Sequence, residues 1–248
     1  MAFTFVEAEN TSLNDTTLTT LSLSYPISMA GWIFKQGPAD VGRICSIYVD
    51  GSSTDRLELG YNSAEDVFAL ANSTADQSVV TTGAGANNAW THGIAIFDGP
   101  TGNITVYRDN GNSATAAQTQ DPGTDLPDLR IGSRAAANYF DGALAEIAIW
   151  SGYSLTVDDR AALFRGFSPL FIRRGALVLY APLWGHVDGF YRDMKGTWNI
   201  IISTLGTNGV TPIDHPRIFY PIPARRFARV AAAPPSALHT LPMLGAGR

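Results

Sequence analysis

The sequence predicts an all-β protein, a sandwich of two antiparallel sheets with one short helix and an extended C-terminal arm. Only 16% of the 248 residues are charged, whereas 45% are hydrophobic and 24 are glycine. Short apolar runs alternate with clusters of Gly, Asn, Asp and Ser, which is typical of strands joined by turns. The length is sufficient for one large sandwich with a substantial core.

The expected strands recur at short intervals. They cover residues 20–24, 27–34, 44–49, 56–61, 67–71, 78–82, 90–97, 104–107, 128–132, 139–150, 177–183 and 198–204. The clearest hairpin joins residues 90–97 to residues 104–107. Asp109-Asn110-Gly111 follows it as a tight-turn signal, because Asn and Gly tolerate positive φ.

One helix is expected. Thr156 can cap its N-terminus, Asp159 stands three residues later as a variant of the capping box, and Gly166 ends it. A dozen strands with a single helix indicate a sandwich rather than alternating β-α units.

The composition changes near Thr211, so we predict a sandwich over residues 1–211 and an extended arm over residues 212–248. The arm is rich in Pro, Ala and Arg, and proline favours extended chain. Mixed guanidinium and apolar groups can add to a neighbouring sheet or lie in its groove. We predict partner binding through Arg225, Arg226, Phe227, Arg229 and Val230.

Charge is distributed unevenly. The net charge is −5, but the segment from Asp214 to Arg248 holds five Arg and one acid, which leaves −9 for the rest. An acidic body disfavours nucleic acid and anionic membrane as partners. The N-terminus lacks the pattern of a secretion signal, and no apolar run approaches the ~20 residues of a membrane helix. The single cysteine, Cys45, is expected to be a buried, inert thiol.

We predict no catalytic residue, no metal site and no cofactor. Glycan hydrolysis needs two cooperating carboxylates. Glu7 and Glu9 precede a polar loop, and Glu146 has no acid two residues to either side. A glycanase with Glu146 as its test residue is kept only as an alternative.

The sequence also contains residues of the types that bind metals and sugars. His92 is interpreted as a structural strand residue, and His186 with Asp188 lacks further ligands nearby. Calcium stays an alternative, since loop carboxylates suit that ion, although the same run is an ordinary turn-rich loop. Its candidate ligands are Asp121, Asp125 and Asp128. No sugar site is assigned, because sandwich aromatics more often pack in the core or across strands; those considered are Tyr139, Trp150, Tyr153 and Trp184.

Three stretches occur in a characteristic order. The first is residues 27–33 with Trp32, and the second is Trp90-Thr91-His92 with its hairpin partner at 104–111. The third joins residues 129–132 to 140–150, ahead of the expected helix. Together they resemble the laminin-G-like jelly-roll domains of the concanavalin A-like lectin/glucanase superfamily. The resemblance covers about residues 1–165 and implies a jelly-roll sandwich.

Residues 177–217 are similar to the ending of such domains in tailed-phage proteins. This resemblance implies a non-enzymatic virion structural protein, a capsid decoration or fibre component anchored by its arm. It would be assembled in the host cytoplasm, with other virion proteins or copies of itself as partners. The alternatives are a host-glycan-binding adhesin and a glycanase on the same fold.

Overall fold

The computed structural model describes most of the sandwich and a short segment beyond it. The described residues are 3–5, 13–15, 23–36, 41–49, 54–62, 66–82, 88–124, 126, 128–134, 138–183, 190–192, 194, 199–202 and 213–220. The helices are α1 (Val157–Phe164) and the short 3-10 helix η2 (Pro169–Phe171). The strands are β1 (Phe3–Phe5), β2 (Leu13–Asp15), β3 (Ile27–Lys35), β4 (Gly42–Tyr48), β5 (Arg56–Tyr61), β6 (Val67–Asn72), β7 (Asp76–Val80), β8 (Trp90–Phe97), β9 (Asn103–Arg108), β10 (Asn112–Ala117), β11 (Asp128–Ile131), β12 (Gly142–Ser151), β13 (Leu177–Ala181), β14 (Phe190–Arg192) and β15 (Asn199–Ile202).

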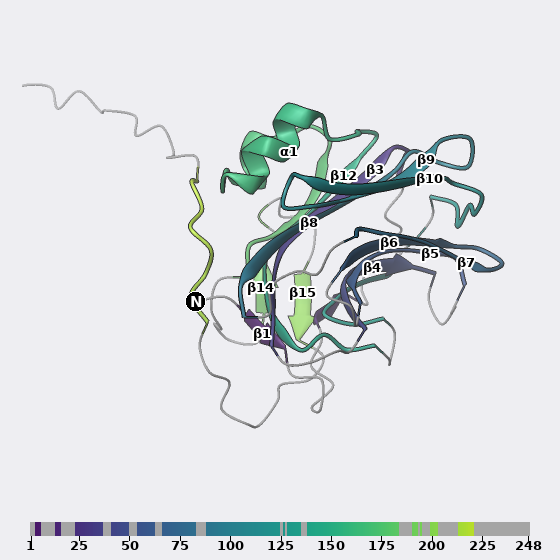
Figure 1. Ribbon diagram of the computed structural model, residues 1–248. Coiled ribbons are helices and arrows are strands. Elements are labelled where there is room, and N and C mark those ends of the chain that lie inside the picture. The colour runs from purple at the N-terminus through teal and green to yellow at the C-terminus, as the bar shows by residue number, and fades with distance from the viewer. Residues whose placement is uncertain are drawn as a thin grey trace, which may run out of the picture.

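The strands form two stacked antiparallel sheets, which confirms the predicted all-β sandwich. The seven-stranded sheet has the order β1-β12-β3-β8-β9-β10, and β13 also pairs with β12. The eight-stranded sheet has the order β14-β15-β2-β11-β4-β5-β6-β7. Helix α1 covers the outer side of the seven-stranded sheet, which therefore lies between α1 and strands β4 to β7 (Figure 1).

Side-chain alternation builds the core between the sheets. In β5, Leu57, Leu59 and Tyr61 point inward and are fully buried, as strand geometry requires for every second residue. Cys45 is buried in the same core, and burial raises the pKa of its thiol to about 12. A thiol with so high a pKa forms little thiolate at neutral pH, which agrees with the predicted inert cysteine.

A second apolar cluster lies beneath α1. Trp150 of β12 is fully buried there, and its Nε1 donates a hydrogen bond to the Ile172 carbonyl oxygen at 2.9 Å. The helix begins as predicted. The Thr156 hydroxyl accepts from the Asp159 amide, and the Asp159 carboxylate accepts from the Thr156 amide. The capping box thereby satisfies two backbone donors that the helix leaves free.

Four strands were not expected, namely the three-residue strands β1, β2 and β14 and the longer strand β10. Strand β10 has the sequence Asn-Ser-Ala-Thr-Ala-Ala and was not expected, but it pairs in regular register with β9. The tight turn between them is as predicted, with φ of +50° at Asp109 and +58° at Asn110. The segment expected as a strand at 20–24 is described only at residues 23–24, and these two residues do not form a strand.

No helix among the described residues is long and apolar enough to cross a membrane. Residues 213–220 contact the sandwich through hydrogen bonds to Trp90 and Gly166. The predicted boundary between residues 1–211 and 212–248 stays a prediction.

Candidate functional site

The predicted partner-binding residues lie outside the described residues, and so do several other candidates. This holds for Arg225, Arg226, Phe227, Arg229, Val230, Glu7, Glu9, Asp125, Trp184, His186, Asp188 and His239. Partner binding by the arm therefore stays a prediction.

Glu146 occupies an irregular position in β12. The register of β12 with β3 shifts between Ala145 and Ala148, and Glu146 has a φ of +57°. On its other side β12 pairs first with β1 and then, from Ile147, with β13. Glu146 therefore lies where β12 changes neighbours, and only 3% of it is exposed.

Both carboxylate oxygens of Glu146 are occupied. The Tyr180 hydroxyl donates to Oε2 at 2.5 Å, and the Tyr220 hydroxyl donates to Oε1 at 2.6 Å. His215 Nε2 lies 3.2 Å from Oε1. We call these four residues the Glu146 cluster. A general acid must reach the oxygen of the scissile bond, and this carboxylate is instead buried and bound by the protein's own groups.

The surroundings of His215 favour its protonated state. Its Nδ1 lies 2.8 Å from the Pro216 carbonyl oxygen, and its Nε2 lies 3.1 Å from the Pro182 carbonyl oxygen. Only an imidazolium donates from both ring nitrogens. Burial lowers the pKa of His215, but the hydrogen bonds with Glu146, Pro216 and Pro182 outweigh it, so the pKa lies above its usual value.

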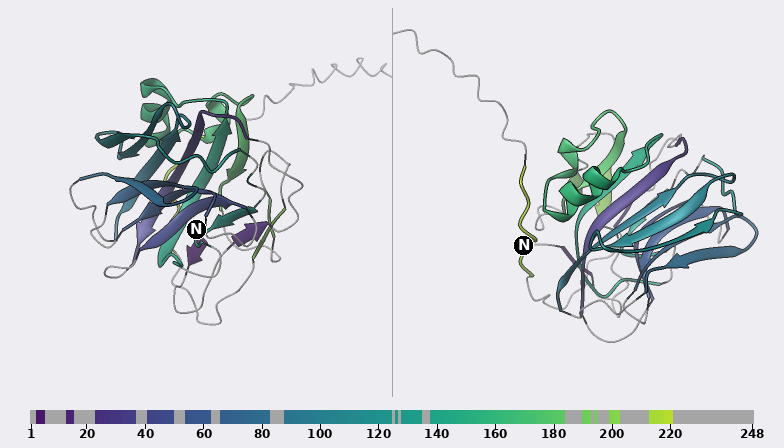
Figure 2. Two further views of the ribbon diagram at one scale, coloured as in Figure 1. Left: turned by 90° about the vertical axis from the view of Figure 1, so that its right-hand side faces the viewer. Right: turned by 45° about the horizontal axis from the view of Figure 1, so that its top comes forward.

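Two members of the cluster belong to residues 213–220, which we call the strap. The strap begins on the outer face of the seven-stranded sheet, where Ile213 packs against Ala143 and Ala145. Trp90 Nε1 donates to the Asp214 carbonyl oxygen at 3.0 Å. Figure 1 shows the strap in yellow-green along the side of the sandwich, and the right view of Figure 2 shows it from a second direction.

The strap ends against the segment that follows α1. The Phe219 amide donates to the Gly166 carbonyl oxygen at 2.7 Å, and the Ser168 amide donates to the Phe219 carbonyl oxygen at 3.0 Å. Phe167 and Phe219 form a parallel bridge. Gly166 has a φ of +86°, and a Cβ added there would lie 2.4 Å from the Arg217 carbonyl oxygen. The close approach therefore depends on this glycine.

The strap completes an exposed surface of three phenylalanines, and each of the two chain segments that form it carries an exposed arginine two residues before its first phenylalanine. Phe167, Phe171 and Phe219 are 41%, 49% and 47% exposed. The Phe167 ring centroid lies 5.9 Å from that of Phe171 and 5.6 Å from that of Phe219. We call this surface, with Arg165 and Arg217, the Phe–Arg patch. Exposed apolar groups that gather in this way mark binding surfaces.

The arginines add directional donors to the patch. The Arg217 guanidinium lies 5.5 Å from the centre of the Phe219 ring, and Arg165 directly precedes Gly166. Both are exposed, and neither forms an ion pair with another residue of the described part of the chain. A guanidinium can then donate to a ligand without first leaving an internal partner.

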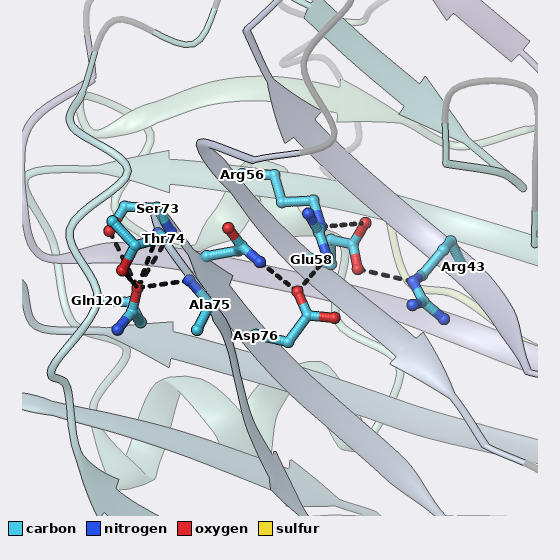
Figure 3. Close-up of polar contacts among 9 residues, drawn as sticks. Arg43, Arg56, Glu58, Ser73, Thr74, Ala75, Asp76 and Gln120 are labelled. Carbon is cyan, nitrogen blue, oxygen red and sulfur yellow. Dashed lines mark hydrogen bonds and ion pairs between the residues drawn. The ribbon is translucent and has the colours of Figure 1, made fainter.

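A second polar cluster lies on strands β4 to β7 (Figure 3). Glu58 Oε2 lies 2.7 Å from Arg43 Nε, and its Oε1 lies 3.3 Å from Arg56 Nε. Arg56 also pairs with Asp76, which accepts a hydrogen bond from Asn72. The Glu58 side chain has no exposed surface. This second buried acid is thus balanced by two arginines and is enclosed, which suits a structural network rather than a ligand site.

The same region joins the edges of the two sheets. Figure 3 shows the Gln120 side-chain oxygen accepting hydrogen bonds from Ser73, Thr74 and Ala75, in the turn between β6 and β7. Asp121 next to it accepts from the Tyr25 hydroxyl and the Gly123 amide. Among the residues that the structure describes, no three His, Cys, Asp or Glu side chains gather as metal ligands.

The described aromatic and histidine candidates are not part of the Phe–Arg patch. Trp150 is buried, and the Tyr153 hydroxyl donates to Asp159 at 2.5 Å. Tyr139 is half-buried. His92 is buried in β8, and burial lowers its pKa to about 3, so it is neutral at physiological pH.

Sequence reasoning missed the patch because its two halves are far apart in the chain. Phe164-Arg165-Gly166-Phe167 and Arg217-Ile218-Phe219 each mix aromatic residues with arginine. This shared composition is the one feature of the sequence that could have indicated the patch. The halves are joined by backbone hydrogen bonds of Phe219 with Gly166 and Ser168, and spacing in the sequence does not show that these distant residues meet.

The comparison with protein families identifies the class of the sandwich. The family model described as the concanavalin A-like lectin/glucanases superfamily matches residues 8–159. The chain therefore belongs to this superfamily, as its jelly-roll-like sandwich and the order of its motifs indicate. A comparison of the sequence with curated proteins found no match.

Solved structures share the fold at low sequence identity. A predicted carbohydrate-binding protein from Bacteroides ovatus is 20% identical with a TM-score of 0.58, covering 82% of this chain and 57% of that one. A heptameric SAP-like pentraxin from Limulus polyphemus is 14% identical with a TM-score of 0.53, covering 65% and 80%. A tailspike protein from the Escherichia coli O157:H7 bacteriophage CAB120 is 15% identical with a TM-score of 0.50, covering 73% and 26%.

Proposed function

We propose that this protein is a non-enzymatic domain that binds glycans through the Phe–Arg patch. The observation that carries the proposal is the exposure of three adjoining phenylalanine rings, with the exposed Arg217 guanidinium beside Phe219 and without an acidic partner in the described chain. The likeness to a predicted carbohydrate-binding protein supports it. So does the enclosure of Glu146 and Glu58, since neither carboxylate is free to act in hydrolysis.

The patch has the two kinds of group that a sugar requires. The flat face of an aromatic ring packs against the apolar face of a sugar ring and excludes water from it. Guanidinium groups donate hydrogen bonds in fixed directions and so select an orientation of the ligand. The rings are close enough for one ligand to contact two of them.

A glycan array with the full chain tests the proposal, followed by titration of the best ligand. Phe219→Ala should weaken binding at least ~10-fold, as expected for a central aromatic contact. Val157→Ala is the matched control, because Val157 is 62% exposed on α1 but is not part of the patch. Reproducible absence of binding to any glycan would leave the proposal without support.

A second proposed role is that of a virion component held by its C-terminal arm. The specific observation is that the strap is hydrogen-bonded to the sandwich near its start, through Asp214 and His215, and at its end, through Phe219 and Tyr220, and leads directly to Pro221. Force on the arm would pass to β12 through the Glu146 cluster. The likeness to a phage tailspike supports this setting, with virion proteins or copies of this chain as partners.

The anchoring role is tested by ending the chain after Tyr220. The shortened protein keeps the strap, and it should fold but fail to join the assembled particle. Changing Arg225, Arg226 and Arg229 to Gln in the full chain should weaken incorporation without removing it. Normal incorporation of the shortened protein would exclude the arm as the anchor.

The glycanase alternative has a direct assay. We expect no release of reducing sugar from β-glucans or bacterial polysaccharides. Release that is lost in Glu146→Gln, with the fold retained, would show an enzyme instead.

A further inference from the structure

We propose that the glycan bound at the Phe–Arg patch is anionic, and that Arg165 and Arg217 pair with its carboxylate or sulfate groups. The inference rests on the proposed glycan-binding function and names the class of ligand. The Phe167, Phe171 and Phe219 rings would then contact the apolar faces of the same sugar chain.

Three buried arginines of the sandwich pair with acids, in contrast to the two exposed arginines of the patch. Arg43 and Arg56 pair with Glu58, and Arg108 pairs with Asp66 at 3.3 Å. Arg165 and Arg217 have no such acid among the described residues, although the chain outside residues 214–248 has a net charge of −9. The acidic body repels anions at long range, but exposed guanidinium groups can pair locally with the charged groups of a bound ligand.

Backbone contacts hold together the two segments that carry these arginines. A Cβ on Gly166 would lie 2.4 Å from the Arg217 carbonyl oxygen, so the chain next to Arg165 touches the strap. Hydrogen bonds of Phe219 with Gly166 and Ser168 fix the register of the two segments. A site that is already ordered loses less conformational entropy when a ligand binds.

Charge also argues against the protein's own arm as the occupant. Residues 221–248 contain four arginines and no acid. Docking of this segment, from the same or another copy, would place like charges against Arg165 and Arg217. An acidic protein segment is the competing ligand, and the experiment includes a probe for it.

The test is binding of the full chain to four polymers at low and high salt. The probes are polygalacturonate for carboxylates, dextran sulfate for sulfates, neutral dextran, and poly-glutamate as an anion without sugar. We expect binding to one or both acidic polysaccharides, weakened by salt because the contacts are exposed charges. Arg165→Gln combined with Arg217→Gln should weaken this binding at least ~10-fold, since each charged hydrogen bond contributes to affinity.

Control variants separate the patch from general charge effects. Arg134→Gln removes a half-buried arginine outside the patch and should change binding less than ~2-fold. Arg217→Lys keeps the charge but loses the planar fork, and its affinity should fall between wild type and Arg217→Gln.

The outcomes distinguish failure of the anionic-ligand proposal from failure of the proposed glycan binding. Equal binding to neutral dextran would overturn the anionic ligand but keep glycan binding. Binding to poly-glutamate as tight as to the acidic polysaccharides would overturn it in favour of a protein partner. Loss of binding in Arg225→Gln with Arg226→Gln, but not in the patch variant, would move the site to the arm. If neither these four polymers nor any array glycan binds, the proposed function itself fails.

Discussion

At the scale of single residues, the Glu146 carboxylate depends on donors that replace water. Tyr220→Phe removes one hydroxyl donor and keeps the ring, so the free energy of unfolding should fall by about 1.5–3 kcal/mol. Urea denaturation monitored by tryptophan fluorescence measures the change. Tyr107→Phe is the control, because its hydroxyl has no hydrogen bond within the described part of the chain, and its effect should stay within ~0.5 kcal/mol. Equal losses in the two variants would contradict the role of the cluster.

His215 should make stability depend on pH in a defined direction. Burial opposes protonation, but the hydrogen bonds with Glu146, Pro216 and Pro182 raise its pKa above the unfolded value near 6.5. Its contribution is fully present below pH ~6.5 and is lost as pH rises through the folded pKa. The difference in unfolding free energy between wild type and His215→Gln should therefore shrink with rising pH.

His92 should make stability depend on pH in the opposite direction. Burial lowers its pKa to about 3, so the folded protein resists its protonation while the unfolded chain accepts a proton near pH 6.5. Stability is then lost as pH falls from about 6.5 toward 3, and His92→Gln should reduce this loss. Parallel denaturation series of the two variants check both signs, and the same trend in both would refute the assignment.

At the scale of elements, the contact between the strap and the end of α1 depends on Gly166. Gly166→Ala should destabilise the protein by about 2–4 kcal/mol, because a Cβ meets the Arg217 carbonyl oxygen in a backbone conformation that is itself unfavourable. Gly152→Ala shares the positive φ but has open space around it, and should cost only about 1 kcal/mol. Thermal unfolding of the two variants measures the difference, which reports the clash with the Arg217 carbonyl oxygen. Similar losses of stability in both variants would show that backbone strain alone is responsible.

Elements with strong local signals could be predicted from the sequence. The hairpin of β8 and β9 follows from alternating apolar residues and the Asp109-Asn110-Gly111 turn. Helix α1 follows from Thr156 and Asp159, which make the predicted capping box. Strand β10 could not be found in this way, because its small and polar residues carry no periodic apolar pattern and its pairing with β9 defines it.

At the scale of the whole molecule, a truncation that keeps the strap and one that removes it should differ in stability. Ending the chain after Tyr220 keeps the Glu146 cluster, and the melting temperature should change by less than ~2 °C. Ending it after Pro212 removes Tyr220 and His215 and leaves Glu146 short of partners, at a cost of about 3–5 kcal/mol. Calorimetry of both proteins decides the point, and equal melting temperatures would show that the strap is not part of the folded unit.

Local features of the sequence are sufficient to predict the class of fold. Alternating apolar residues, turn signals and the order of the Trp32, Trp90 and Trp150 segments are local properties, and local properties suffice to define strands and their family. The roles of Glu146 and of the strap could be recognised only from the folded structure. Their partners are separated by up to 74 residues, as Glu146 and Tyr220 are, and no local pattern specifies which distant groups will meet. The Phe–Arg patch exists for the same reason, since it forms where the strap returns to the end of α1.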